Sequence, residues 1–262
     1  MSSYESAPLV NSVPFDPVVA VATEGGILAS IERAFEPIRE VLVPVLSNPV
    51  VLAVWLAIVL VCVGVLWWDL RQRNRVLGSF MKFVWTLTVA YSGPIGLAVY
   101  WYTGRTQIAS DSLWKRGFRS TSHCYSGCGA GEVVGITLAQ GLLRLGIVVV
   151  VAGVTFAFAY LFGFALTIGP LMQDGVGFKE AVADALWSET PSITIMEIAA
   201  VGTDLLLASE AAITDVLFWL ALAFSLSIGF LVAWPVNIGL IEFGVKEGMS
   251  DPSEMDGSAS AD

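Results

Sequence analysis

Long apolar stretches separated by short polar ones dominate the first half of the sequence. Val50–Trp68 is 19 residues without a charge. As a helix rising about 1.5 Å per residue, it spans roughly 28 Å, enough to cross the hydrocarbon core of a bilayer. Phe83–Tyr102 forms a second apolar stretch, in which Pro94 is expected to kink the helix. Both stretches end in Trp or Tyr, which favour the membrane interface. The pattern therefore predicts a two-helix transmembrane hairpin, with its loops, over residues 49–119.

The second half is apolar for 42 residues, from Ala130 to Leu171, which is about twice one crossing. We expect a first helix at 130–146 and a full span at 147–169, with one long helix projecting from the membrane as the alternative. Ile193–Ala208 and Val216–Trp234 predict two further spans. The fold class is thus all-α: a polytopic integral membrane protein with five or six transmembrane helices, placed in the plasma membrane.

The two ends of the chain differ from this apolar middle. Residues 1–48 are expected to form an irregular tail followed by an amphipathic helix at 25–47, which lies either on the membrane surface or on a polar edge of the protein. Residues 250–262 are rich in Ser, Asp and Gly and are predicted to be a disordered acidic tail. Between the hairpin of 49–119 and this tail lies a helical transmembrane domain over 120–249.

Composition supports the bilayer as the solvent of this chain. Hydrophobic residues make up 56% of it and charged residues 14%, whereas soluble domains carry about 25% charged residues. The formal net charge of -10 argues against nucleic-acid binding, which relies on basic surfaces. The acidic ends are either ordinary solvated segments or the mark of a salt-adapted, halophile-like proteome, in which dense carboxylates keep surfaces hydrated.

The most informative stretch for chemistry is Ser122–Glu132. It holds the only histidine, His123, and two of the three cysteines, Cys124 and Cys128. Imidazole and thiolate are ligands for copper and zinc. In a helix Cys124 and Cys128 share a face, and Glu132 lies one turn further along it. We predict a metal site at His123, Cys124, Cys128 and Glu132, with copper first and zinc as the alternative. A disulfide between the two cysteines, or a packing role, are the other interpretations.

Polar residues inside the apolar stretches suggest a second site. Glu197 and Asp204 lie seven residues apart and share a helix face. Arg144 is the only basic residue in the long apolar stretch, and Gln140 precedes it by one turn. The structural hypothesis is an interhelical ion pair of Arg144 with Glu197 or Asp204. The functional hypothesis is a proton or cation path lined by Glu132, Glu197 and Asp204.

The stretch Ser122–Glu132 resembles a family signature in residue type and spacing. Its matching positions are His123, Cys124, Gly127, Cys128, Gly131 and Glu132. The signature is His-Cys-x-x-Gly-Cys-x-x-Gly-Asp, of a membrane family catalogued as domain-of-unknown-function family 4396.

Two more stretches agree with that family. Ser188–Ala199 is similar to its Ala-Asp-x-Leu-Ser-x-Thr-x-Phe-Glu-x-Gly helix, and Trp234–Met249 to its Pro-Val-Asn-Tyr-Trp…Gly-x-Lys-x-x-Met ending. Among the departures, Glu132 and Glu189 stand where the family has Asp. The matching positions in these stretches include Ser192, Thr194, Glu197, Asn237 and Lys246. The resemblance covers about residues 120–250.

The resemblance implies no agreed activity. Some relatives are fused to copper-binding cupredoxin-like domains, which favours copper over zinc and points to a cupredoxin-like protein, or another membrane protein, as a partner. No cupredoxin ligand set is present in this chain.

Sequence motifs for catalysis are absent. A single histidine rules out an HExxH zinc motif, and there is no P-loop or dinucleotide fingerprint. An enzyme is therefore the least favoured class, although a redox role of the cysteines stays open. The leading hypothesis is metal (copper) binding or transfer. The alternatives are an ion or small-solute transporter or channel using Arg144, Glu197 and Asp204, and a non-enzymatic membrane scaffold subunit. The expected partners are the lipid bilayer and either a second copy or another protein.

Overall fold

The computed structural model describes residues 26–173 and 175–254, and over these ranges the chain is helical without strands. It divides into two units, residues 1–37 and 38–262. The first unit contains the beginning of helix α1, Ile27–Leu46, so the helix expected at 25–47 is present. That this helix is amphipathic, and that it lies on a membrane surface or on a polar edge of the protein, stays a prediction.

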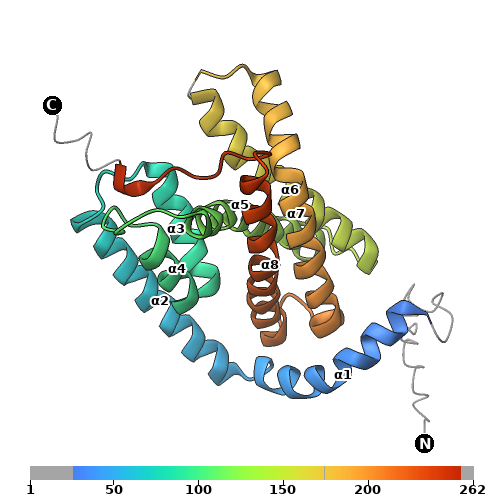
Figure 1. Ribbon diagram of the computed structural model, residues 1–262. Coiled ribbons are helices and arrows are strands. Elements are labelled where there is room, and N and C mark those ends of the chain that lie inside the picture. Colours follow the sequence, from blue (N-terminus) through green and yellow to red (C-terminus); the bar gives the residue numbers. More distant parts are fainter. Residues whose placement is uncertain (1–25, 174, 255–262) are drawn as a thin grey trace, which may run out of the picture. The chain divides into compact units, whose positions relative to one another are not determined.

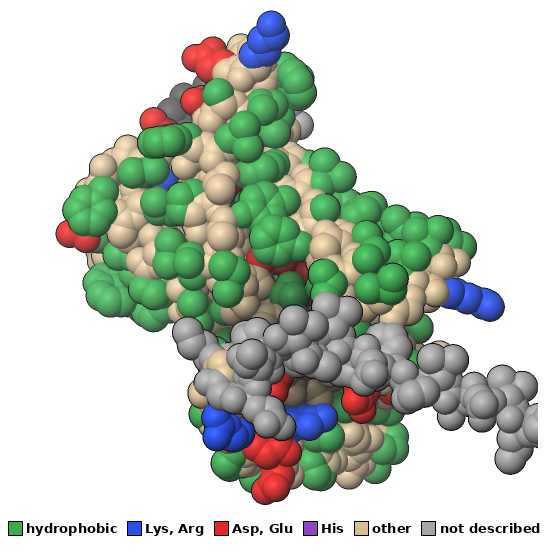
Figure 2. Space-filling model, turned by 90° about the vertical axis from the view of Figure 1, so that its right-hand side faces the viewer, with side chains coloured by type: hydrophobic (Ala, Val, Ile, Leu, Met, Phe, Trp, Pro, Cys, Tyr) green, Lys and Arg blue, Asp and Glu red, His purple; other side chains and the backbone are tan. Residues whose placement is uncertain are grey.

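Four helices of the described chain are long and apolar enough to cross a membrane. The four are α2 (Pro49–Gln72), α6 (Val148–Gln173), α7 (Phe178–Ala208) and α8 (Val216–Glu242). In Figure 2, hydrophobic side chains cover most of the upper part of the visible face, as expected for a surface that meets lipid. The protein is therefore an integral membrane protein with four candidate spans.

The second expected span, Phe83–Tyr102, is not one continuous helix. It is divided between α3 (Ser79–Ser92) and α4 (Pro94–Thr103). The break falls at Gly93, whose φ of 55° lies in the left-handed region that glycine tolerates. Pro94 then begins α4 at a position where its missing N–H costs nothing. The sequence predicted a kink at this proline, whereas the structure has a complete break, and each half is too short to cross a bilayer.

The largest departure from expectation is α5, Leu113–Ile136. We expected the next helix after the hairpin only at 130–146. Instead α5 begins directly after Ser112, whose hydroxyl accepts a hydrogen bond from the backbone N–H of Lys115 at 3.3 Å. A π-helical segment, η2 (Thr137–Leu142), follows, and a turn separates it from α6. The alternative of one long continuous helix is therefore also wrong.

Helix α5 lies at the centre of the second unit, where it packs against α3, α4, α6, α7 and α8 (Figure 1). Its glycines allow close packing on α6. A Cβ added at Gly131 would lie 2.3 Å from the backbone oxygen of Phe158, and one at Gly135 would lie 2.9 Å from the Cα of Thr155. Small residues at this spacing let two helix backbones approach each other in membranes. A helix poor in apolar residues is thus largely buried by its neighbours.

A buried ion pair fastens the end of α2 to α4 and to the turn after it. Asp69 is fully buried and accepts two hydrogen bonds from Arg105, at 2.8 and 3.0 Å. The same carboxylate accepts from Tyr100 Oη at 2.8 Å and from Asn74 Nδ2 at 2.7 Å. Because every partner is satisfied, this network is structural.

A buried arginine on α5 holds the C-terminal segment in place. Arg119 contacts Asp111 at 2.8 Å and donates to the backbone oxygens of Thr103 and Met249, each at 3.2 Å. The backbone N–H of Met249 in turn donates to Ser120 Oγ at 3.1 Å. These bonds lay the chain that follows α8 along the first half of α5.

Only the beginning of the tail that the sequence predicted to be disordered lies within the described residues. Residues 250–254 are described and end in a short helical turn at 252–254. The rest of that prediction, residues 255–262, and the irregular tail expected at residues 1–25 lie outside the described residues.

Candidate metal centre

Four polar side chains from distant parts of the sequence meet inside the helical bundle. Cys124 Sγ on α5 donates to Glu189 Oε2 on α7 at 2.9 Å. Lys246, which follows α8, places its Nζ 2.6 Å from the same oxygen and 3.5 Å from Cys124 Sγ. Its third acceptor is Asn237 Oδ1 on α8, at 3.1 Å. All four side chains are buried, so they form a closed network of thiol, carboxylate, ammonium and amide.

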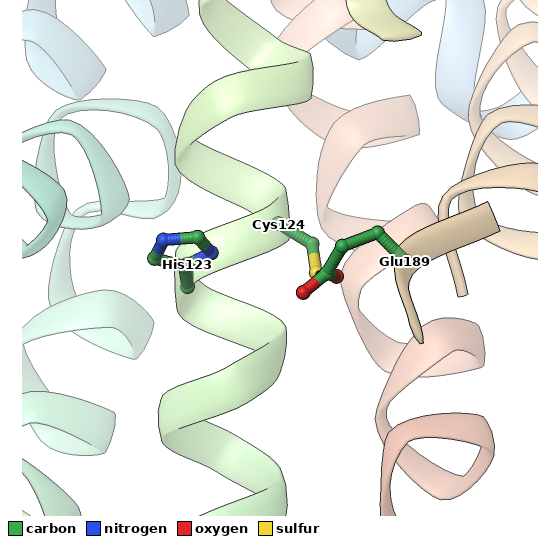
Figure 3. A group of neighbouring side chains, drawn as sticks. All are labelled: His123, Cys124 and Glu189. Atoms are coloured by element: carbon green, nitrogen blue, oxygen red, sulfur yellow. The ribbon is translucent and has the colours of Figure 1, made fainter. Parts of the chain in front are cut away.

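His123 completes a group of potential metal ligands. One ligand atom from each of His123, Cys124 and Glu189 lies within 4.8 Å of the others. In Figure 3 the Cys124 thiol and the Glu189 carboxylate point toward one another from α5 and α7, and the His123 ring lies beside them on α5. His123 is only 5% exposed and also packs against Phe80 of α3, at 5.5 Å between ring centroids. The site is therefore shielded on several sides.

Lys246 supplies the positive charge of this site in the structure. Burial alone would lower its pKa, but the neighbouring Cys124 and Glu189 more than offset this and hold the pKa of Lys246 above its usual value. The lysine sits on a short segment between Gly244, with φ 69°, and Gly248, with φ 78°. Glycine is the residue that adopts such angles without strain. A charged group on a non-helical segment thus neutralises Glu189.

Cys128 lies one turn beyond Cys124 and outside this group of ligands. Its Sγ lies 3.3 Å from where a Cβ on Gly163 would be, so it packs against α6, and it neighbours Glu197 of α7. The three cysteines are free thiols. The disulfide that the sequence left open is therefore not formed, because Cys124 turns toward Glu189 and Cys128 toward α6 and Glu197.

A family model described as "Domain of unknown function (DUF4396)" matches residues 113–246. The chain belongs to this family. No curated protein and no solved structure matched the chain. In this DUF4396 protein the matched segment begins with α5 and ends on Lys246 itself, so it contains every side chain of the network described above.

The three stretches that resemble the family in sequence meet at this one place. The first stretch contributes His123 and Cys124, and the second contributes Glu189. The third contributes Asn237 and Lys246. The sequence analysis predicted His123 and Cys124 as metal ligands, but it did not place the other three residues in this site. Their only signal was that they fall in the two further stretches shared with DUF4396.

The remaining polar residues of α5, η2 and α7 lie further along the bundle. Glu197 is fully buried and neighbours Glu132. Glu132, Gln140 and Asp204 line a cavity of about 50 Å³. These four residues were expected from sequence to lie within the membrane, and the structure groups them between the helices, apart from His123 and Cys124.

Arg144 does not join them. The predicted ion pair with Glu197 or Asp204 is wrong, since Arg144 is exposed and makes no ion pair with any described residue. It lies in the turn between η2 and α6, with φ 52°. The sequence pattern suggested a continuous apolar helix through this position, whereas the turn directs the arginine outward. The carboxyl groups of Glu132, Glu197 and Asp204 are left without that cation.

Proposed function

We propose that this DUF4396 protein binds a thiophilic metal ion reversibly at His123, Cys124 and Glu189, with copper as the first candidate and zinc as the alternative. The observation that carries the proposal is the convergence of an imidazole, a thiol and a carboxylate within 4.8 Å inside a membrane protein. Such clusters of soft and borderline donors are what these metals select.

The donor set fits both candidate metals. Imidazole and thiolate suit copper(I) and zinc equally, whereas a carboxylate oxygen suits zinc better than copper(I). The sequence analysis had Cys128 in the donor set, whereas the structure has Glu189 in its place. This exchange of a thiol for a carboxylate makes zinc a stronger candidate than the sequence alone indicated. Three protein ligands leave a fourth position open for a ligand from elsewhere. An open position is what transfer to or from another protein requires, and a cupredoxin-like partner or another membrane protein fits that role.

Lys246 is expected to weaken metal binding at this site, because its positive charge competes with a metal cation for Glu189. Glu189 accepts a hydrogen bond from Lys246 Nζ through Oε2 at 2.6 Å. A positive charge so close to the carboxylate repels a metal cation, so metal binding at Glu189 is favoured when Nζ moves away. Because Lys246 sits between two glycines with positive φ, this movement requires no displacement of a helix. Competition between ammonium and metal favours exchange over permanent storage.

The decisive experiment compares two cysteine variants of the detergent-purified protein. Cys124→Ser removes the thiol of the donor group, and Cys128→Ser is the matched control one turn along α5. After loading with copper(I) or zinc, wild type and Cys128→Ser should retain near-stoichiometric metal, and Cys124→Ser should lose it. Equal metal in wild type and Cys124→Ser would refute the site.

The two other functional hypotheses change in different ways. The hypothesis of a transporter or channel retains Glu197 and Asp204 as candidate residues. Arg144 is no longer a candidate, because it is exposed. A scaffold subunit becomes the better account if none of the three forms carries metal and the protein co-purifies with another chain.

A further inference from the structure

Three carboxyl groups form a second cluster, away from Lys246. Glu132 is 2% exposed, and its Oε1 has no hydrogen-bond partner among the described residues; fully buried Glu197 neighbours it. Asp204 is partly buried, and its Oδ1 is likewise unpartnered within the part of the chain that the structure describes. Buried polar atoms are normally satisfied, so two orphaned carboxyl oxygens beside one cavity call for an unseen partner.

Among the described residues, no basic side chain forms an ion pair with this cluster. The cavity beside it has no lysine or arginine in its lining. Lys246 is engaged with Glu189, and Arg144 points outward. Charged carboxylates without a counter-ion are strongly disfavoured in a low-dielectric interior. The structure therefore needs either a bound cation or bound protons here.

The cavity offers a cation room and oxygen ligands. Its volume of about 50 Å³ exceeds the roughly 10–15 Å³ that one water requires. Glu132 and Asp204 line it with carboxylates, and Gln140 lines it with an amide. The hydroxyl of Thr155, also in the lining, donates to the backbone oxygen of Val151 at 2.9 Å, which leaves its lone pairs available as acceptors.

The backbone around Gln140 adds support from an unusual feature. Gln140 belongs to η2, the π-helical segment that follows α5. Single π-helical turns inside or beside α-helices are rare and are frequent at functional sites. Here the wider turn lies at the point where Gln140 lines the cavity.

We propose that this cavity binds a hard monovalent cation of the Na⁺ class, coordinated by Glu132 and Asp204 with Gln140 and Thr155. An all-oxygen ligand set selects hard cations and contrasts with the nitrogen and sulfur of the metal centre. Mg²⁺ fits poorly, because it demands octahedral geometry and keeps several waters. Glu197 neighbours Glu132 and does not line the cavity. This site is independent of the metal centre.

The test follows thermal unfolding of the full-length protein in detergent at pH 8, with NaCl replaced by choline chloride at constant ionic strength. Wild-type Tm should rise with Na⁺ and saturate. Glu132→Gln should weaken the apparent affinity by about tenfold or more, and Asp204→Asn provides a second variant if the first fails to fold. Glu210→Gln, at an exposed position outside the cavity lining, is the matched control and should respond like wild type.

Three outcomes would overturn the proposal. Equal Tm in Na⁺ and choline would show that the carboxyl groups hold protons and take no cation. An undiminished Na⁺ response in both Glu132→Gln and Asp204→Asn would place the ion elsewhere. A response to Ca²⁺ but not to Na⁺ would contradict the monovalent assignment. Cys124→Ser should keep the full Na⁺ response, which separates this test from that of the metal centre.

Discussion

Replacing Lys246 by methionine removes the ammonium group that donates to Glu189 while keeping a side chain of similar length. In the structure the Lys246 and Glu189 side chains are 8% and 4% exposed, and Nζ donates to three acceptors. Lys246→Met therefore leaves a buried carboxylate without its counter-ion.

The expected cost follows from that burial. Breaking a buried ion pair by removing one partner typically costs about 3–5 kcal/mol, because the other charge stays in a low-dielectric interior. The double variant Lys246→Met/Glu189→Gln removes both charges and should recover part of that loss. A metal at His123, Cys124 and Glu189 would also neutralise the carboxylate. Metal binding should therefore be tighter in Lys246→Met than in wild type.

Both effects can be measured by unfolding in detergent with and without zinc or copper(I). Zinc at 100 times its Kd stabilises a folded protein by about 2.7 kcal/mol, so metal should offset a large part of the loss in Lys246→Met. Lys179→Met, at an exposed position on α7, is the control and should match wild type. The reasoning fails if Lys246→Met is as stable as wild type without metal, or if its metal affinity falls.

Three further predictions concern the frame that holds the site. Asp69→Ala removes a fully buried carboxylate from its ion pair with Arg105 and should lower the free energy of unfolding by about 3–5 kcal/mol. The exposed control Asp184→Ala should change it little, and equal effects of the two would argue against the network. Burial raises the pKa of Asp111, but its hydrogen bond to a buried arginine and that arginine's charge lower it more, so the net pKa is below its usual value. Its stabilisation is therefore full above the unfolded-state pKa of about 3.9 and is lost as pH falls through the lowered folded-state pKa. Tm in acid should fall less steeply in Asp111→Asn than in wild type, and identical pH profiles would contradict this. Gly131→Ala would place a Cβ 2.3 Å from a backbone oxygen of α6 and should lower the free energy of unfolding by about 1–3 kcal/mol or more. In the control Gly153→Ala the added Cβ meets nothing within 4 Å. Equal stability of the two variants in denaturant unfolding would refute close α5–α6 packing.

Hydropathy predicts the long apolar helices and fails for α5. Val50–Trp68 and Val216–Trp234 lie within α2 and α8, as the sequence indicated. The first half of α5, in contrast, is polar, and no helix was predicted there. Its polar side chains are satisfied by neighbours, as when Arg119 pairs with Asp111. Mean hydropathy along a segment reports how apolar that segment is. It carries no information on hydrogen-bond and ion-pair partners that distant helices supply in the folded protein.

The candidate site shows the same division between local and long-range information. His123 and Cys124 are adjacent in sequence, so their chemistry was visible in the pattern. Glu189 and Lys246 are separated from Cys124 by 65 and 122 residues. Their meeting depends on how α5, α7 and the segment after α8 pack, which residue spacing does not encode. The Arg144 prediction failed for the same reason, since one turn before α6 points it outward.

The measurement that tests the account most directly is the metal content of purified wild type, Cys124→Ser and Cys128→Ser after loading with copper(I) or zinc. The account predicts close to one ion per chain in wild type and in Cys128→Ser, and almost none in Cys124→Ser. Metal retained in Cys124→Ser, or lost equally from both variants, would contradict a centre built from His123, Cys124 and Glu189.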